Sequence, residues 1–349
     1  MKDMDRVRVG VIGAGFMGGL HARAVAESGF GTLVAVADPD LSRARDLAAA
    51  HGSTAYADFA EMFQREGLDA VVVASPETMH REPVVMAAEH GCAILVEKPI
   101  AASLDDADAM IAACDVASVP LMVGYILRFE PSYARIQQAV EAGSVGAFLT
   151  GYGRRNAPIS EGERLAGRTT VINYLAVHDL DQILWYHPVD VIQVSAKAVR
   201  SRIYGRFGVA DFTWITAEFA DGALAVVESG WALSEGWAGW GKPAAWGGFG
   251  DVEMNVIGTT GVVSLNFTPM NLYGVDAEEG WKLPDTRHWP VINGRLVGAV
   301  RNEMDHFLTC VQNGTAPLVD GRAARKSLEI GIAADRSIEL GREIELPLD

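Results

Sequence analysis

Cysteine, positive charge and long apolar runs are all scarce in this sequence of 349 residues. The three cysteines are widely spaced and odd in number, so neither a disulfide framework nor a zinc site is expected, which suits a reducing cytoplasm. Lysine and arginine number 29 against 45 acidic residues, and the net charge of -16 argues against nucleic acid or anionic membrane as a partner. No apolar run approaches a membrane span, and the acidic N-terminus argues against a signal peptide.

The overall composition is that of an ordinary globular protein, with 49% hydrophobic and 21% charged residues. The chain is long enough for two domains, each with its own core. The pattern of predicted elements changes after residue 124. We therefore expect a dinucleotide-binding domain over 1–124 and a substrate-binding and oligomerisation domain over 125–349.

The most informative stretch is a short apolar run that opens at Val7 and ends in a glycine-rich turn. Gly13, Gly15 and Gly18 have the spacing G-x-G-x-x-G, with Phe16 and Met17 between the last two, and a helical pattern follows at once. A strand, a glycine turn and a helix in this order are typical of a site for the pyrophosphate of a dinucleotide. The turn's residues are therefore expected to bind the cofactor.

Asp38 ends the next buried strand, over 33–37, and lies twenty residues after the last motif glycine. A carboxylate there accepts hydrogen bonds from the ribose hydroxyls and repels a 2′-phosphate, so NAD is favoured over NADP. Arg43 keeps NADP open, because a nearby arginine sometimes accommodates that phosphate. The competing interpretation of Asp38 is a helix N-cap before Leu41.

Further buried strands are expected at 69–74 and 93–96, each followed by polar residues. Ligands of doubly wound sheets lie at the carboxyl ends of their strands. Ser75, Pro76 and His80 follow the first of these strands, and Glu97, Lys98 and Pro99 follow the second. Lys98 is either an acid–base group whose pKa is lowered by partial burial or a surface lysine in a loop.

Beyond residue 125 we expect a helix, a strand, a loop or flap and a second helix, in that order, over residues 128–142, 147–152, 154–168 and 169–186. The second helix places Tyr174, His178 and Gln182 on one face by their i, i+4 spacing, with Asp181 alongside. Taken alone, His178 is equally well explained as a satisfied histidine of a helix core.

The region 191–267 is predicted to form an antiparallel sheet with hairpins at 221–222 and 258–261. The segment 231–250 is rich in glycine and tryptophan, and its indoles could stack on a sugar or fill a subunit interface, with the interface favoured. Two helices, over 301–313 and 323–340, end the chain and are expected to pack back across the domain boundary.

Several weak motifs occur in register along almost the whole chain. They are the glycine turn at 13–18, Ser75-Pro76 with His80, Glu97-Lys98-Pro99, Arg128-Phe129 with Pro131 and Tyr133, the turn at 143–146, His178-Asp179-Leu180-Asp181, and Glu303 with His306-Phe307. As a set they resemble the Gfo/Idh/MocA family of glucose–fructose oxidoreductase, inositol dehydrogenase and rhizopine-catabolism proteins.

The resemblance implies an α/β fold: an N-terminal Rossmann domain with a doubly wound parallel sheet, and a C-terminal α/β domain with an open, mostly antiparallel sheet that builds homodimers or homotetramers. It also implies a cis Lys98–Pro99 bond and places Lys98 and His178 beside the nicotinamide. Many members carry an acid one turn before the histidine. Tyr174 stands there in this chain, and tyrosine is uncharged at neutral pH.

The leading hypothesis is hydride transfer between NAD and a secondary hydroxyl of a cyclic polyol or sugar, without a metal. His178 would accept the hydroxyl proton, and Lys98 would stabilise the charge developing on the same oxygen, with the exchange of these two roles left open. Tyr174 would orient the ring. Further substrate contacts are expected from Tyr125, Arg154, Arg155, Asn173 and Trp237.

Two other functions remain open at this point. One is a cofactor-binding sensor or regulator without turnover, which Tyr174 in place of an acid would permit. The other uses tightly held NAD as an internal redox catalyst for elimination or glycoside cleavage. The residues do not distinguish among the sugars and cyclitols.

Overall fold

The chain folds into two units, which we describe separately from a computed structural model covering residues 6–234, 251–267, 274–276, 280–282 and 288–348. Unit 1 comprises Met1–Glu130 and His288–Lys326, and unit 2 comprises Pro131–Arg287 and Ser327–Asp349. Unit 1 thus extends past residue 124 and includes a segment from near the end of the chain. None of the helices in the described ranges has the length and apolar character needed to cross a bilayer.

Unit 1 is built on a parallel sheet of six strands in the order β3-β2-β1-β4-β5-β6. The strands are β1 (Val7–Ile12), β2 (Gly31–Ala37), β3 (Thr54–Tyr56), β4 (Ala70–Val73), β5 (Ala93–Glu97) and β6 (Leu121–Gly124). All residues of β4, β5 and β6 are buried, as expected for parallel strands covered on both faces. The expected doubly wound sheet is confirmed.

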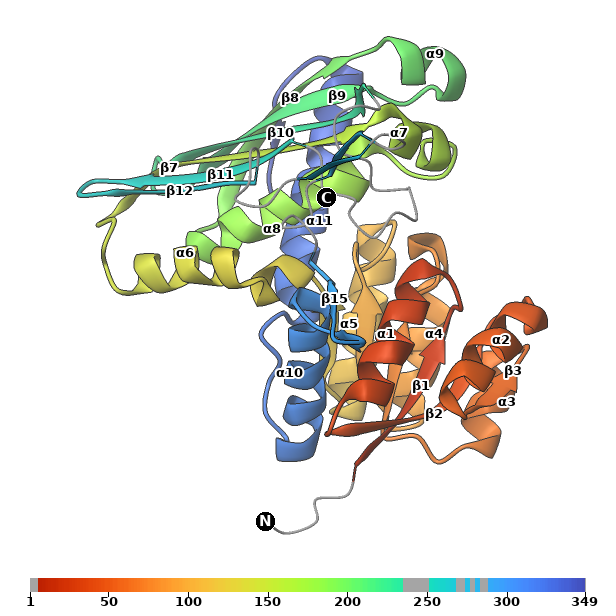
Figure 1. Cartoon of the computed structure of the whole chain (residues 1–349). Helices are drawn as coiled ribbons and strands as arrows, with labels where there is room; N and C mark the ends of the chain where they lie inside the picture. Colours follow the sequence, from red (N-terminus) through yellow and green to blue (C-terminus); the bar gives the residue numbers. More distant parts are fainter. Residues whose placement is uncertain (1–5, 235–250, 268–273, 277–279, 283–287, 349) are drawn as a thin grey trace. The chain divides into compact units, whose positions relative to one another are not determined.

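Helices connect successive strands of this sheet and pack beside it (Figure 1). They are α1 (Phe16–Glu27), α2 (Leu41–His51), α3 (Phe59–Arg65), the 3₁₀ turn η1 (Glu77–Met79), α4 (Arg81–Glu89) and α5 (Leu104–Ala117). Asp40, Asp58 and Ser103 are N-caps whose side chains accept backbone N–H bonds. Local sequence therefore fixes where α2, α3 and α5 begin.

The strand order reverses between β1 and β4, and this switch point is where doubly wound folds bind ligands. Backbone hydrogen bonds join the end of β1 to the ends of both its neighbours, β2 and β4. The N–H of Gly13 donates to the carbonyl of Ala37 and that of Ala74 to the carbonyl of Ile12, each at 2.8 Å. The glycine turn and the turn after β4 therefore lie side by side.

Unit 2 contains a sheet of seven strands in the order β12-β11-β7-β10-β9-β8-β17. The strands are β7 (Phe148–Pro158), β8 (Val191–Val199), β9 (Phe212–Phe219), β10 (Leu224–Leu233), β11 (Asp251–Gly258), β12 (Val262–Asn266) and β17 (Ile344–Glu345). Only the β7–β10 pair in this sheet is parallel. The sheet is mixed and mostly antiparallel, as the resemblance implied.

Two sequence-based expectations in unit 2 are wrong. The predicted loop or flap over 154–168 is instead the second half of β7 followed by α7 (Ile159–Leu165). Both flanking pairings of β7, with β10 and β11, continue past Arg154, so tertiary pairing overrides its polar sequence. The predicted continuous helix over 169–186 contains a π-helix, η3 (Ile172–Ala176), before α8 (Val177–Tyr186).

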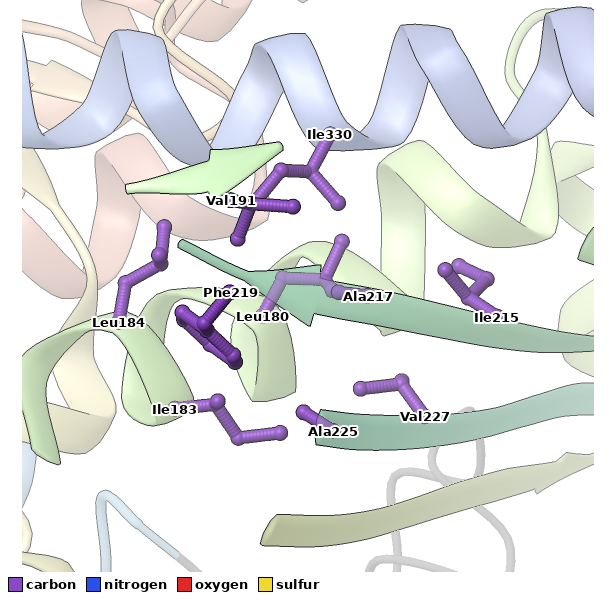
Figure 2. A pocket seen from close by; sticks show the side chains of 10 residues that line it. All are labelled: Leu180, Ile183, Leu184, Val191, Ile215, Ala217, Phe219, Ala225, Val227 and Ile330. Carbon is purple, nitrogen blue, oxygen red and sulfur yellow. The ribbon is translucent and has the colours of Figure 1, made fainter. Parts of the chain in front are cut away.

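Helices cover the inner face of this second sheet (Figure 1). Besides α7 and α8 they are α6 (Pro131–Glu141), preceded by the turn η2 (Ile126–Phe129) of unit 1, and α11 (Gly321–Leu340). The short helix α9 (Arg202–Phe207) lies between β8 and β9 in the chain and contacts α7. Figure 2 shows apolar side chains of α8, α11 and the sheet around a cavity of about 10 Å³. A void of that size holds one water molecule at most, so it is a packing defect of the core.

Trp231 is also a core residue, contrary to both roles expected for the tryptophan-rich segment. It lies in β10 with 0% of its surface exposed, and its indole N–H donates to the carbonyl of Ala210 at 2.8 Å. Trp237, Trp240 and Trp246 lie outside the described residues. Two short hairpins complete the described elements, β13 (Gly274–Asp276) with β14 (Gly280–Lys282) and β15 (Val291–Ile292) with β16 (Arg295–Leu296).

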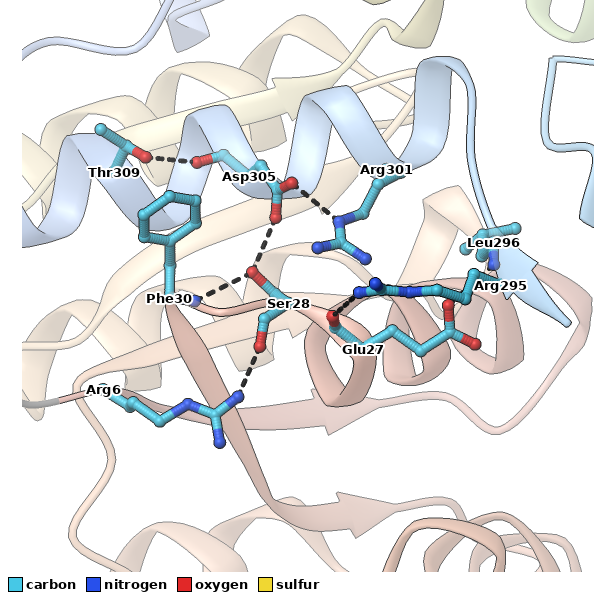
Figure 3. A network of polar contacts seen from close by, with 9 residues as sticks. All are labelled: Arg6, Glu27, Ser28, Phe30, Arg295, Leu296, Arg301, Asp305 and Thr309. Atoms are coloured by element: carbon cyan, nitrogen blue, oxygen red, sulfur yellow. Dashed lines mark hydrogen bonds and ion pairs between the residues drawn. The ribbon is translucent and has the colours of Figure 1, made fainter. Parts of the chain in front are cut away.

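The late segment of unit 1 is joined to α1 and to the turn after it by polar contacts from β16 and from α10 (Ala299–Asn313) (Figure 3). The buried Ser28 is the centre of this network. Its hydroxyl donates to the Asp305 carboxylate at 2.6 Å, and Asp305 also accepts from Arg301 at 2.7 Å. The N–H of Leu296 donates to the Glu27 carboxylate at 2.7 Å. These contacts fix α10 in place against the first βα unit.

We expect Ser28→Ala to lower the free energy of unfolding by about 1–2 kcal/mol, because it removes a buried hydrogen bond to a charged group. Denaturant unfolding followed by circular dichroism measures this change. Ser42→Ala is the matched control, since Ser42 is exposed and its loss should change stability by less than about 0.5 kcal/mol. Equal stabilities of the two variants would contradict the role given to Ser28.

Candidate active site

The three motif glycines differ in what surrounds them, and each surrounding fits the role expected from the motif. Gly13 has φ +97°, and a Cβ there would lie 2.7 Å from the carbonyl oxygen of Ala74. A Cβ on Gly18 would lie 1.8 Å from the carbonyl oxygen of Gly13. These two positions allow only glycine, because the chain is folded tightly onto itself.

Gly15 lies in open space instead. No described atom would come within 4 Å of a Cβ at this position. Gly15 is the N-cap of α1 and provides no side-chain cap for the first helical amides. Free amides at a helix N-terminus attract phosphate, and an uncovered backbone lets a ligand approach closely. The geometry of this turn therefore fits a dinucleotide pyrophosphate.

The two residues between Gly15 and Gly18 line the outside of the same turn. Phe16 is 68% exposed, and its ring meets the Trp289 ring edge-on at a centroid distance of 5.7 Å. Met17 is half-buried. Trp289 belongs to the late segment of unit 1, so this segment contributes an aromatic side chain beside the glycine turn.

Asp38 faces the glycine turn and is not a helix cap. Its carboxylate accepts from the backbone N–H of Ala14 at 2.7 Å and from that of Asp40 at 2.9 Å. The N-cap of α2 is Asp40, whose carboxylate also pairs with Arg43 at 3.3 Å. The competing interpretation of Asp38 as an N-cap is therefore wrong, and its carboxylate faces the glycine turn.

The turn after β4 is held by His80, whose ring is buried. Its Nε2 lies 2.9 Å from the carbonyl oxygen of Ser75, and its Nδ1 lies 3.0 Å from that of Ile100. The ring thus bridges the turn that carries Pro76 to the segment after Pro99. Both ring nitrogens contact protein carbonyls, so His80 acts here by fixing two loops at the cofactor edge of the sheet.

Lys98 is half-buried and follows β5 directly. The Lys98–Pro99 peptide bond is cis, as the resemblance implied. The preceding residue, Glu97, is buried, and its carboxylate lies 2.7 Å from His21 Nε2 and accepts the backbone N–H of Lys98 at 3.2 Å. The side chain of Glu97 is therefore directed into unit 1, where it holds the backbone of Lys98.

Arg154 and Arg155 point to opposite faces of the unit 2 sheet, as successive strand residues do. Arg154 is on the outer face, where it pairs with Asp251 at 2.8 Å and Glu253 at 2.9 Å of β11. Arg155 is buried and forms a bidentate pair with Asp179, at 2.8 and 3.0 Å. Each guanidinium is thus bound by carboxylates of unit 2 itself.

The buried Arg155–Asp179 pair fixes α8 to β7 directly beside His178. Burial raises the pKa of Asp179, and the guanidinium of Arg155 opposes that rise. The pKa of Arg155 is raised by Asp179 and Tyr133 even though burial alone would lower it. The Arg155 side chain also donates to the Tyr133 hydroxyl at 2.8 Å. A buried pair of this geometry orients the first turn of α8.

His178 is buried, with 7% of its surface exposed, and lies one residue into α8. The π-helix η3 ends just before it, and single π turns are frequent at functional sites. Because η3 interrupts the α-helical register, Tyr174, His178 and Gln182 do not form a regular i, i+4 stripe. Gln182 is fully buried and accepts from the Tyr186 hydroxyl at 2.8 Å, so it is a core residue.

Tyr174 belongs to a polar cluster that the sequence did not indicate. Its hydroxyl lies 3.2 Å from the Arg164 guanidinium and 3.4 Å from the carboxylate of Glu161. Glu161 is buried and accepts from Arg164 at 2.5 Å. Burial, with Glu161 nearby, raises the pKa of Tyr174, which keeps the phenol neutral. A carboxylate is thus present beside Tyr174, and it comes from α7.

The remaining predicted substrate residues are Tyr125 and Asn173. Tyr125 is fully buried at the end of β6 in unit 1, and Asn173 is half-buried in η3 of unit 2. Trp237 lies outside the described residues. Within the described ranges, no group of three or more His, Cys, Asp or Glu side chains is placed to hold a metal ion.

We expect Gly15→Ala to fold with wild-type stability but to weaken NAD binding by at least tenfold, because the added methyl meets only the incoming ligand. Gly18→Ala should lower stability severely, since its Cβ would overlap the Gly13 carbonyl. Titration calorimetry and thermal unfolding measure the two effects. Unchanged NAD affinity in a folded Gly15→Ala variant would refute the placement of the pyrophosphate.

Comparisons with known proteins agree with this geometry. Residues 7–125 match the family described as an oxidoreductase family with an NAD-binding Rossmann fold, and residues 133–264 match the GFO/IDH/MocA C-terminal domain. The chain is 28% identical to scyllo-inositol 2-dehydrogenase (NAD(+)) of Bacillus subtilis, across 98% of this chain and 96% of that protein.

Two further matches support the same assignment. Inositol 2-dehydrogenase 1 of Saccharopolyspora erythraea is 32% identical, across 78% of each chain. The fold is similar to that of scyllo-inositol dehydrogenase from Lactobacillus casei, with a TM-score of 0.82 at 18% identity across 98% of this chain and 99% of that one. The chain therefore belongs to the Gfo/Idh/MocA family of oxidoreductases with an NAD-binding Rossmann domain.

Proposed function

We propose that this protein is a dehydrogenase that oxidises a secondary hydroxyl of a cyclitol, or of a closely similar ring sugar, with NAD. The observation that carries the proposal is the placement of Lys98 at the end of β5, in the same sheet as the glycine turn. Glu97 and His80 fix the chain on either side of it. The names of the inositol dehydrogenase relatives favour a cyclitol over other alcohols.

The cofactor, when bound, supplies the hydride acceptor, and the protein supplies proton transfer and charge stabilisation. In the proposed reaction His178 takes the proton of the substrate hydroxyl as a general base. Lys98 donates a hydrogen bond to the same oxygen and stabilises its developing negative charge. Position supports both residues. Lys98 follows a Rossmann strand, and His178 follows a π turn and precedes Asp179, which Arg155 binds.

The residues around Lys98 and His178 orient the substrate. In this proposal Tyr174 presents a neutral hydroxyl, with Glu161 and Arg164 holding it, and Asn173 and Tyr125 add polar contacts. Arg154 and Arg155 contribute by fixing β7 to β11 and to α8. Trp237 remains a candidate for stacking on the ring.

The test is a screen of cyclitols, free sugars, sugar phosphates and nucleotide sugars with NAD and with NADP, read as reduced-nicotinamide absorbance. We expect turnover with a cyclitol and NAD. The placement of the Asp38 carboxylate beside the expected ribose position supports NAD over NADP. A protein that binds NAD tightly yet reduces none across the whole panel would contradict the proposal.

We expect Lys98→Ala to reduce kcat by about 10²–10⁴-fold on the substrate so identified, because the transition-state oxygen loses a cationic donor. NAD affinity should change only a few-fold. Lys326→Ala is the matched control, since Lys326 is exposed on α11, and it should keep wild-type kcat. Undiminished turnover of Lys98→Ala would refute the role of Lys98.

The outer face of the unit 2 sheet supports a second proposal, that the protein forms a homodimer or homotetramer through this face. Outward residues of β8 and β9 leave large apolar side chains accessible, among them Trp214 at 39% exposed and Val199 at 42% exposed. Such side chains are common where a sheet packs on a second copy.

We also propose a cytoplasmic location, which the three buried, free cysteines support.

If the outer face of the unit 2 sheet forms the interface, Trp214→Glu should shift the protein to a smaller assembly, because a charge would be buried against the partner copy. Light scattering coupled to size-exclusion chromatography measures the mass. Exposed Val116 of α5 lies in unit 1, and Val116→Glu should leave the mass of the assembly unchanged. A wild-type protein that runs as a monomer at all concentrations would refute the proposal.

A further inference from the structure

Three ionisable side chains of unit 1 are buried, and one of them immediately precedes Lys98. His21 of α1 and Glu303 of α10 have 0% of their surface exposed, and Glu97 of β5 has 7%. His21 Nε2 and Glu97 Oε1 are 2.7 Å apart. The second Glu97 oxygen accepts the backbone N–H of Lys98 at 3.2 Å. A single carboxylate thus links a buried imidazole to the backbone of the proposed catalytic lysine.

Glu303 is the unusual member of this group. Neither of its carboxyl oxygens has a hydrogen-bond partner among the described residues, and His21 Nδ1 has none there either. An ionised carboxylate in such a position would be very costly, whereas a protonated acid costs much less. Burial and the nearby charge of Glu97 both raise the pKa of Glu303, well above its usual value of 4.5. The burial of Glu303, its two unpartnered oxygens and the nearby charge of Glu97 all favour a neutral Glu303.

Other charged groups on the elements packed against α10 are engaged elsewhere. Arg23 of α1 pairs with Glu27 at 2.6 Å, and Arg128 of η2 donates to the carbonyl of Leu318. Arg8 of β1 donates to the carbonyl of Gly67. On α10 itself, Arg301 pairs with Asp305 at 2.7 Å. Glu97 is therefore the charge that governs Glu303.

We propose that His21, Glu97 and Glu303 form one buried acid cluster that sets the position of Lys98, with Glu303 as the member that keeps a proton. In this arrangement the cluster carries one carboxylate charge, that of Glu97, and His21 and the Lys98 backbone share it. A second charge, on Glu303, would repel Glu97 and disturb the turn. The three residues are positioning residues, and their importance for turnover rests on the proposed function of Lys98.

The proton on Glu303 determines the direction in which the stability of the protein changes with pH. Where a carboxyl group has a higher pKa in the folded protein than in the unfolded chain, the unfolded chain loses its proton first. Stability then falls as the pH rises above about 4.5 towards the folded pKa. Glu303→Gln keeps the shape and the neutral state but cannot ionise, so it should lack this loss.

The first measurement is therefore denaturant unfolding of the full chain at pH 5 and pH 8. The denaturant midpoint of Glu303→Gln minus that of wild type should be larger at pH 8 than at pH 5. Glu89→Gln, at an exposed glutamate of α4, should show no such pH-dependent difference. A difference between Glu303→Gln and wild type that is the same at both pH values would overturn the assignment of the proton.

The second measurement observes Lys98 without using turnover. The sequence contains six lysines, so reductive ¹³C-methylation gives few NMR signals, and the Lys98→Arg variant assigns the one from Lys98. We expect His21→Gln to shift the Lys98 signal and leave the others in place. His90→Gln, at an exposed histidine, should shift none of them.

These readouts separate the two proposals. An unshifted Lys98 signal in His21→Gln would overturn the positioning cluster whatever the enzyme's activity. Full turnover of Lys98→Ala would instead overturn the proposed function and leave the cluster result standing. Once a substrate is known, His21→Gln should lower kcat by about tenfold or more, while KM changes little, as expected when an orienting partner is lost.

Discussion

A tight steric contact determines how α1 enters unit 1: Gly18 lies against the carbonyl oxygen of Gly13, just after β1. A methyl group at Gly18 would overlap that oxygen at 1.8 Å, so the helix can enter at this angle only through glycine. The uncapped N-terminus of α1 and the open backbone at Gly15 lie at this entry, where the Asp38 carboxylate accepts the backbone N–H of Ala14. The cofactor edge of the sheet is thus set by the backbone more than by side chains.

Lys98 follows a strand of the same sheet, and buried polar groups hold it in position. Its backbone is held by Glu97, Glu97 by His21, and the turn opposite by both ring nitrogens of His80. In unit 2 the corresponding anchor is the buried Arg155–Asp179 pair, which holds the start of the helix that carries His178. Buried charges that are well paired give orientation at the cost of desolvation, which suits groups that must not move.

The sequence predicted the Rossmann unit well, because its strands are short apolar runs ended by polar residues and its glycines have fixed spacing. It failed where long-range pairing decides the outcome. Arg154 to Pro158 read as a loop yet continue β7 between two partner strands, and Trp231 is a core residue. No local pattern distinguishes His21 or Glu161 from ordinary helix residues, and Glu303 belonged to the motif set without an assigned role. His21 owes its role to Glu97, 76 residues away, Glu161 to the side chains of Arg164 and Tyr174, and Glu303 to its burial and the nearby Glu97.

The central claim is that a hydride passes from a ring carbon of the substrate to NAD. The most direct measurement supplies the protein with NAD and an inositol that carries deuterium on the carbon to be oxidised, and then weighs the reduced cofactor by mass spectrometry. The account predicts that the reduced nicotinamide carries the deuterium. Reduced cofactor without deuterium, or no reduced cofactor from any labelled inositol, would contradict it.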